Sequence, residues 1–193
     1  MNVAEFLRSL NVFDLLVVLV MFAFFIVGYI QGTIRRLLGL ASILFSFLVA
    51  ANLREPLGSF FAANWTQYER EYSFMIAFGV VFVLAVLGFS LTIQTFYTKV
   101  ELFEKYPIID EVLGGLLGVV QGMVILGAII AILDSFFLLP GIPPRSTELP
   151  ALRELHQALD PSGTAILFRQ SLLPAFFAVF GPLLPEAIKD FYG

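Results

Sequence analysis

The sequence predicts an all-α membrane protein with four transmembrane helices and a C-terminal tail of amphipathic, interfacial helices. Of its 193 residues, 59% are hydrophobic and 13% are charged, which is about half the charge that soluble domains carry. Four uncharged runs are long enough to cross a hydrocarbon core of ~30 Å, because a helix rises about 1.5 Å per residue. The chain after these runs is richer in proline and charge, which favours short helices at the membrane surface.

The first spanning helix is expected at about residues 15–34, which carry no charge. This run is longer than the apolar core of a signal peptide and no A-x-A cleavage site follows it, so we expect it to be retained. It ends at Arg35 and Arg36, which have no acidic residue beside them. We interpret the pair as topology anchors that contact lipid phosphate and place both chain termini outside the cytoplasm.

The second helix is expected at about residues 37–53, close to the shortest length that spans a bilayer. The segment Arg54-Glu55-Pro56 is predicted to end it, because proline breaks helices. Its small residues lie three or four positions apart and share one face, which favours close packing against another helix. These residues are Gly39, Ser42, Ser46 and Ala50.

A loop is expected at residues 57–71, before a third helix at about residues 72–98. Trp65, Tyr68 and Tyr72 are predicted to be interface anchors, since their amphipathic rings prefer the headgroup layer. The third helix is the longest uncharged run and should be tilted or extend beyond the bilayer.

The fourth helix, at about residues 112–133, contains Gly114, Gly118 and Gly122 at intervals of four. These glycines share one face and form a groove where another backbone can approach closely. In water each glycine would cost the helix ~1 kcal/mol relative to alanine, a cost that close packing in a membrane can offset. Asp110 precedes the run and is expected to cap the helix.

The fourth helix completes a predicted transmembrane domain at residues 1–138, and residues 139–193 form a proline-rich linker and helical tail. Residues 148–160 predict an amphipathic helix, in which His156 is expected on the solvated polar face. The last segment, about 164–185, is apolar but interrupted by Arg169, Pro174, Gly181 and Pro182. We expect it to lie in the interface or on the bundle, with a re-entrant segment as the alternative.

Two glutamines lie inside apolar helices in the same local pattern, apolar-G-x-x-Q-G, at Val27–Gly32 and Leu117–Gly122. A polar residue at membrane depth usually faces protein or water. Gln31 and Gln121 therefore either form interhelical hydrogen bonds worth ~0.6 kcal/mol or line a polar path at a repeat interface. Gly28 and Gly32 of the pattern are added to the predicted packing positions.

Two aspartates, Asp14 and Asp134, are expected at the same-side ends of the first and fourth helices. They are either solvated boundary residues or a carboxylate pair at the mouth of the candidate polar path.

The composition argues against several classes of chemistry. The chain has no cysteine, which excludes disulfides and thiol chemistry. Ser42 and Ser46 have no histidine at membrane depth to act as a base, and no metal-ligand or nucleotide motif is present. We therefore expect no enzyme, cofactor or metal. The net charge of −4 also gives no reason to expect a nucleic-acid partner.

Three segments occur in the order and spacing of one known family. The first segment is Asp14 followed by Gln31-Gly32-Thr33-Ile34-Arg35, which is similar to the family pattern D…RG-x-x-R-E. The second runs from Asp110 to Gly122 and is similar to D-x3-G-x3-G-x-x-R-G. Leu133–Phe136 resembles the end of the helix that carries this pattern. Ser171–Pro174 matches an S-x-x-P signature. On these residues the chain resembles the colicin V production protein (CvpA) family of bacterial inner-membrane proteins. It departs at Gln31 and Gln121, where the family often has arginine, and at Arg36, where it often has glutamate.

The resemblance implies a four-helix inner-membrane protein linked to colicin V production or export and to envelope homeostasis. Our leading hypothesis is a non-enzymatic protein that acts through helix packing and assembly. Its expected partners are the lipid bilayer and either further copies of itself or other membrane proteins. The alternative is a transporter or channel subunit for a small solute, with a polar path near Gln31 and Gln121.

Overall fold

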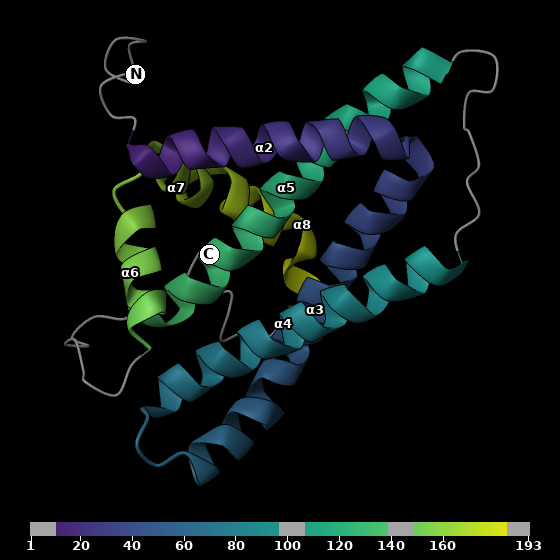
Figure 1. The fold of residues 1–193 in the computed structure, drawn as a ribbon. Helices are drawn as coiled ribbons and strands as arrows, with labels where there is room; N and C mark the ends of the chain where they lie inside the picture. The colour runs from purple at the N-terminus through teal and green to yellow at the C-terminus, as the bar shows by residue number, and fades with distance from the viewer. Residues whose placement is uncertain (1–10, 97–106, 139–148, 185–193) are drawn as a thin grey trace.

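The computed structural model describes residues 11–96, 107–138 and 149–184 (Figure 1). Every element in these ranges is a helix. The bundle consists of α2 (Val12–Gln31), α3 (Thr33–Asn64), α4 (Arg70–Phe96) and α5 (Pro107–Phe137). The tail consists of α6 (Pro150–Leu159), α7 (Gly163–Leu167), the π-helix η1 (Phe168–Leu172), α8 (Leu173–Phe180) and the 3-10 turn η2 (Gly181–Leu183).

The arrangement of the bundle follows from two pairings. The helix α4 runs back along α3, and α5 crosses α2 (Figure 1). Residues 139–148, which include the start of the predicted proline-rich linker, and residues 97–106, which include Lys99 and Lys105, lie outside the described residues. The predicted class, an all-α multi-pass membrane protein, is confirmed.

Five described segments are long and apolar enough to cross a membrane, one more than the four predicted. The additional segment is Gly163–Leu183, in which α7, η1, α8 and η2 follow one another without a break. The proline that was expected to interrupt it, Pro174, lies in the first turn of α8. The proline follows the wider turn of the π-helix η1 directly, where the regular i→i−4 hydrogen-bond pattern is already interrupted.

The turn between α2 and α3 consists of a single residue, Gly32, whose φ of +77° is the one positive φ in the described chain. A side chain at this position would be strained, and its Cβ would lie 2.5 Å from the carboxylate of Asp110. The helix α2 therefore ends before the predicted residue 34. Arg35 and Arg36 lie in the first turn of α3, which corrects their predicted place between helices.

The helix α3 continues through Pro56 to Asn64, so the prediction that Arg54-Glu55-Pro56 ends the helix is wrong. A proline inside a helix costs ~3 kcal/mol, and packing against α4 offsets this cost. Gly58 lies directly against Phe74, and the guanidinium of Arg54 lies 5.6 Å from the centre of the same ring.

The connection between α3 and α4 is consequently shorter than the loop expected at residues 57–71. Trp65 and Tyr68 lie in it, with the indole stacked on Phe61. Tyr72 was predicted to be an interface anchor but is only 3% exposed, and its hydroxyl accepts a hydrogen bond from the backbone of Leu149. This tyrosine belongs to the contact between bundle and tail.

The core lies between α3, α4, α5 and the tail. Phe78, Ile130 and Phe136 are fully buried, and the ring of Phe47 packs against those of Phe78 and Phe176 at 5.3 Å each. Since Phe176 comes from α8, the tail contributes to the core of the bundle. The outward faces of α2 and α4 expose large apolar side chains, as expected of helices that face lipid.

Candidate functional site

The glycine positions predicted for helix packing lie at the crossing of α2 and α5 of one chain. A Cβ atom on Gly114 would lie 2.5 Å from the carbonyl oxygen of Gly28, and one on Gly118 would overlap the carbonyl oxygen of Phe24. A Cβ on Gly122 would lie 2.9 Å from the sulfur of Met21. The two backbones are therefore in direct contact, and this contact fixes which residues of α2 and α3 lie opposite α5.

A polar pocket of about 200 Å³ lies beside this crossing, between the α2–α3 turn, the last turns of α4 and the middle of α5. Both glutamines of the repeated pattern line it. The full lining is Gln31, Arg35, Arg36, Gly39, Ser90, Ile93, Gln94 and Gln121. The structure thus brings Gln31 and Gln121 together, whereas Asp14 and Asp134 lie elsewhere.

Arg36 connects two helices at the wall of this pocket. Its side chain is buried, with 5% of the residue exposed, and its Nη1 donates a hydrogen bond of 2.7 Å to Oε1 of Gln121. Burial against α5 corrects the expectation that Arg36 is an exposed anchor at the membrane surface. For Arg35, which is half-buried, the interpretation as a lipid-phosphate anchor stays a prediction.

The small-residue face of α3 continues from the pocket into the bundle. A Cβ atom on Gly39 would lie 3.0 Å from the amide nitrogen of Gln121. Ser42 and Ser46 are buried further along, and the hydroxyl of Ser46 donates to the carbonyl oxygen of Ser42. The face is directed toward neighbouring helices, as close packing requires.

Asp110 was expected to cap the helix that it precedes, but it lies within the first turn of α5 and is directed at α3. Its carboxylate accepts a hydrogen bond of 3.4 Å from the backbone N–H of Thr33, and its carbonyl oxygen accepts one of 2.9 Å from the hydroxyl of Thr33. A carboxylate at a helix N-terminus satisfies an otherwise free N–H group. Asp110 therefore stabilises the start of α3.

Asp14 connects the start of α2 to the start of α7. It forms a capping box with Asn11 and also accepts hydrogen bonds from the backbone N–H groups of Gly163 and Thr164, at 3.2 and 2.9 Å. The hydroxyl of Thr164 donates a further bond of 2.6 Å. Only 2% of Asp14 is exposed. Of the two interpretations given for it, the solvated boundary residue is therefore wrong.

Asp134 is fully buried and holds the tail through Arg169. The guanidinium of Arg169 donates two parallel hydrogen bonds to its carboxylate, from Nε at 2.8 Å and from Nη2 at 2.7 Å. The third nitrogen, Nη1, donates to Asp160 at 2.6 Å. This bidentate geometry is the strongest arrangement of an arginine and a carboxylate. We call Asp134, Asp160, His156 and Arg169 the tail cluster.

His156 was predicted on a solvated polar face, and this prediction is wrong. The residue is 9% exposed, its ring stacks on Phe137 with centroids 4.9 Å apart, and Nε2 lies 3.5 Å from Asp134. The amphipathic helix α6 places its histidine toward the bundle because α6 packs on the end of α5 (Figure 1).

Arg169, Thr164 and Asp160 are the residues of this region that sequence reasoning did not assign to a site. Arg169 offered a signal, because a cation within an apolar segment requires a partner. The partner lies 35 positions away along the chain, and no local pattern identifies it.

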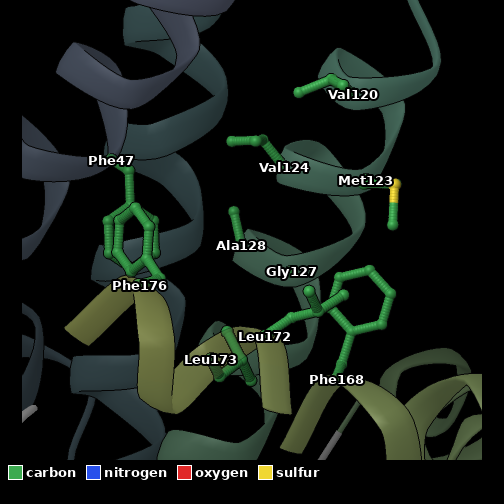
Figure 2. Close-up of a pocket in the computed structure, with 10 residues that line it drawn as sticks. All are labelled: Phe47, Val120, Met123, Val124, Gly127, Ala128, Phe168, Leu172, Leu173 and Phe176. Atoms are coloured by element: carbon green, nitrogen blue, oxygen red, sulfur yellow. The ribbon is translucent and has the colours of Figure 1, made fainter. Parts of the chain in front are cut away.

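A second pocket, of about 220 Å³, lies between α5 and the tail. Figure 2 shows Val120, Val124 and Ala128 of α5 on one side and Phe168, Leu172 and Leu173 of the tail on the other. Its lining is entirely apolar and offers no group to orient a polar ligand. Among the residues that the structure describes, no group of histidine and acidic side chains is arranged to hold a metal ion.

Comparison with protein families identifies the family of the chain. The model of a family described as Colicin V production protein matches residues 13–157. The match covers well over half of the chain, from the start of α2 into α6, and includes the polar pocket, Asp14 and Asp134. No curated protein and no solved structure matches the chain.

Proposed function

The chain belongs to the colicin V production protein family, and on that premise we propose that it is an accessory protein for colicin V production and export and for envelope homeostasis. It acts through helix packing and assembly in the inner membrane and carries out no catalysis. One observation supports this most: α2 packs mainly on the glycine face of α5, and much of its apolar surface is uncovered. Leu19, Phe22 and Ile30 are 67%, 60% and 72% exposed.

An uncovered apolar helix of this kind fits lipid and also a partner helix. The proposed partners are a second copy of the chain or another membrane protein of the export pathway. The arginines at the α2–α3 turn support a cytoplasmic position for this turn. With α2, α3, α4 and α5 as the four spanning helices and the tail at the surface, both termini then lie outside.

A complementation experiment tests the role in export. In a colicin V-producing bacterium that lacks its own family member, expression of the chain is expected to restore the toxin in the medium. Phe22→Ala on the uncovered face of α2 is expected to lower secretion several-fold, because it removes part of the assembly surface. Leu84→Ala is the matched control, since Leu84 is equally exposed on α4, at 62%.

Both variants must reach the membrane in wild-type amounts, as measured by immunoblot. Failure of the wild-type chain to restore secretion contradicts the export role. Normal secretion by Phe22→Ala contradicts the use of α2 as an assembly surface.

The second candidate function is that of a transporter or channel subunit for a small solute. It is favoured by the position of Gln31 and Gln121, which lie in separate helices and line one polar pocket. Such a pocket holds water, because its polar groups need partners and its volume exceeds the ~30 Å³ that one water occupies.

Single cysteines can test this candidate, since the chain has none of its own. A thiol introduced by Gln121→Cys is expected to react with a membrane-impermeant reagent in inside-out vesicles and to be protected in intact cells. Trp65→Cys, at the opposite end of α3, is the control and should show the reverse pattern. Protection of position 121 in both preparations, in a folded protein, excludes the solute path.

A further inference from the structure

We propose that the polar pocket is a binding site for a small, multiply charged oxyanion of the phosphate class, held by Arg35 and Arg36. This inference does not depend on the proposed role in assembly. It rests on the charge of the pocket, on its free hydrogen-bond donors and on its volume.

Among the residues that the structure describes, those lining the pocket carry a net positive charge. Arg35 and Arg36 both line it, and none of its other lining residues is acidic. No ion pair joins either arginine to a carboxylate of the described residues. A buried cation without an anionic partner is costly in a protein interior and more so within a membrane. An anion in the pocket removes this cost.

The donors of the pocket are arranged for an acceptor that the chain does not supply. Nε of Arg36 is buried and has no hydrogen-bond partner in the described structure. Arginine can only donate hydrogen bonds, so the Gln121 atom that accepts from Nη1 is the amide oxygen. The amide nitrogen of Gln121 then lies on the side of Gly39 and is free to donate. Gln31, Gln94 and Ser90 add further side-chain donors to the lining.

The size and charge of the pocket favour a phosphate group over a carboxylate. Its volume of about 200 Å³ is below the ~300 Å³ at which pockets for drug-sized ligands begin. The planar fork of arginine matches phosphate and carboxylate alike. A phosphate monoester, however, carries about −1.5 to −2 charges at pH 7 and can balance two arginines, whereas a carboxylate balances one.

Gly39 keeps the pocket open. A methyl group at this position would lie 3.0 Å from the amide nitrogen of Gln121 and would occupy space beside the free donors. The phosphate can come from two sources, free phosphate in solution or the phosphate of a lipid headgroup, and the two share the chemistry that the arginines recognise.

Calorimetric titration of the full chain in a neutral detergent tests the site. One arm uses inorganic phosphate, a second uses a short-chain phosphatidic acid and a third uses acetate, all at constant ionic strength. Saturable binding of at least one phosphate probe, with acetate much weaker, is expected. Arg35→Gln and Arg36→Gln should each weaken binding by about tenfold or more, the loss expected when a charge-assisted hydrogen bond is removed.

The matched control is Arg54→Gln, which removes an arginine from the same helix, outside the pocket, and is expected to leave binding unchanged. Arg35 is half-buried, so its variant reports on binding even if Arg36→Gln does not fold. Tighter binding of phosphatidic acid than of inorganic phosphate identifies a lipid headgroup as the ligand, and equal or weaker binding identifies free phosphate. Absence of binding by both probes, or equal binding by wild type and Arg35→Gln, overturns the proposal.

Discussion

Replacement of Arg169 by glutamine is expected to lower the free energy of unfolding by about 3–5 kcal/mol, the cost of removing one partner of a buried ion pair. The substitution removes the two hydrogen bonds that the guanidinium donates to Asp134, whose carboxylate is fully buried. It also removes the contact that holds η1 on the end of α5. The tail is therefore expected to separate from the bundle before the bundle unfolds.

The measurement is denaturant-induced unfolding of the purified chain in detergent, with limited proteolysis to detect release of the tail. Asp160→Asn is the matched control, because it removes the other carboxylate that Arg169 contacts, and that side chain is 50% exposed. An exposed ion pair contributes about 0–1 kcal/mol. Equal losses for Arg169→Gln and Asp160→Asn would show that the buried pair does not hold the tail.

The double variant Arg169→Gln, Asp134→Asn separates the pair from other effects. It removes the buried negative charge together with its partner and is expected to recover part of the stability that Arg169→Gln loses. A double variant whose loss equals the sum of the two single losses would contradict a direct interaction between the two side chains.

Replacement of Gly118 by leucine is expected to force α2 and α5 apart and to cost about 3 kcal/mol or more, the upper end of the range for overpacked cores. Even the Cβ atom of alanine would overlap the backbone oxygen of Phe24. A backbone atom cannot rotate out of the way as the end of a side chain can. The helices must therefore move, and the pocket beside the crossing moves with them.

Gly88→Leu provides the control for this variant. Gly88 lies in α4, and a Cβ atom there would meet no atom within 4 Å, so the leucine is expected to face lipid without loss of stability. Thermal unfolding in detergent measures both variants. A melting temperature of Gly118→Leu equal to that of Gly88→Leu would contradict backbone contact at the crossing.

The sequence predicts the membrane class and the four main helices because long apolar runs have few alternatives. It predicts the ends of these helices less well, because tertiary contacts decide where each helix ends. Pro56 predicts a helix end, yet α3 continues past it because Gly58 and Arg54 pack on Phe74. The early end of α2 depends on Gly32, whose positive φ ends the helix, and on Asp110 of α5, which accepts a hydrogen bond from the start of α3.

For the candidate sites, local patterns identify which residues are unusual but not which residues they meet. The repeated glutamine pattern singles out Gln31 and Gln121, and both line one pocket. Arg36 was assigned to lipid because adjacent arginines at a helix end usually mark topology, whereas the fold turns it toward α5. Likewise, the partners of Asp14 and Asp134 lie in the tail, which no spacing rule connects to the bundle.

The central claim is that the glycine face of α5 is filled by α2 of the same chain, which brings together the polar pocket and the anchors of the tail. Phe25→Cys with Gly115→Cys tests it directly, because a Cβ atom on Gly115 would lie 2.7 Å from the ring of Phe25 and the chain has no other cysteine. Treatment with a short thiol cross-linker is expected to join the two thiols within one chain, which mass spectrometry of proteolytic peptides and a monomeric gel mobility would show. Covalent dimers from a mixture of the two single-cysteine chains, without a link inside the double variant, would contradict the claim.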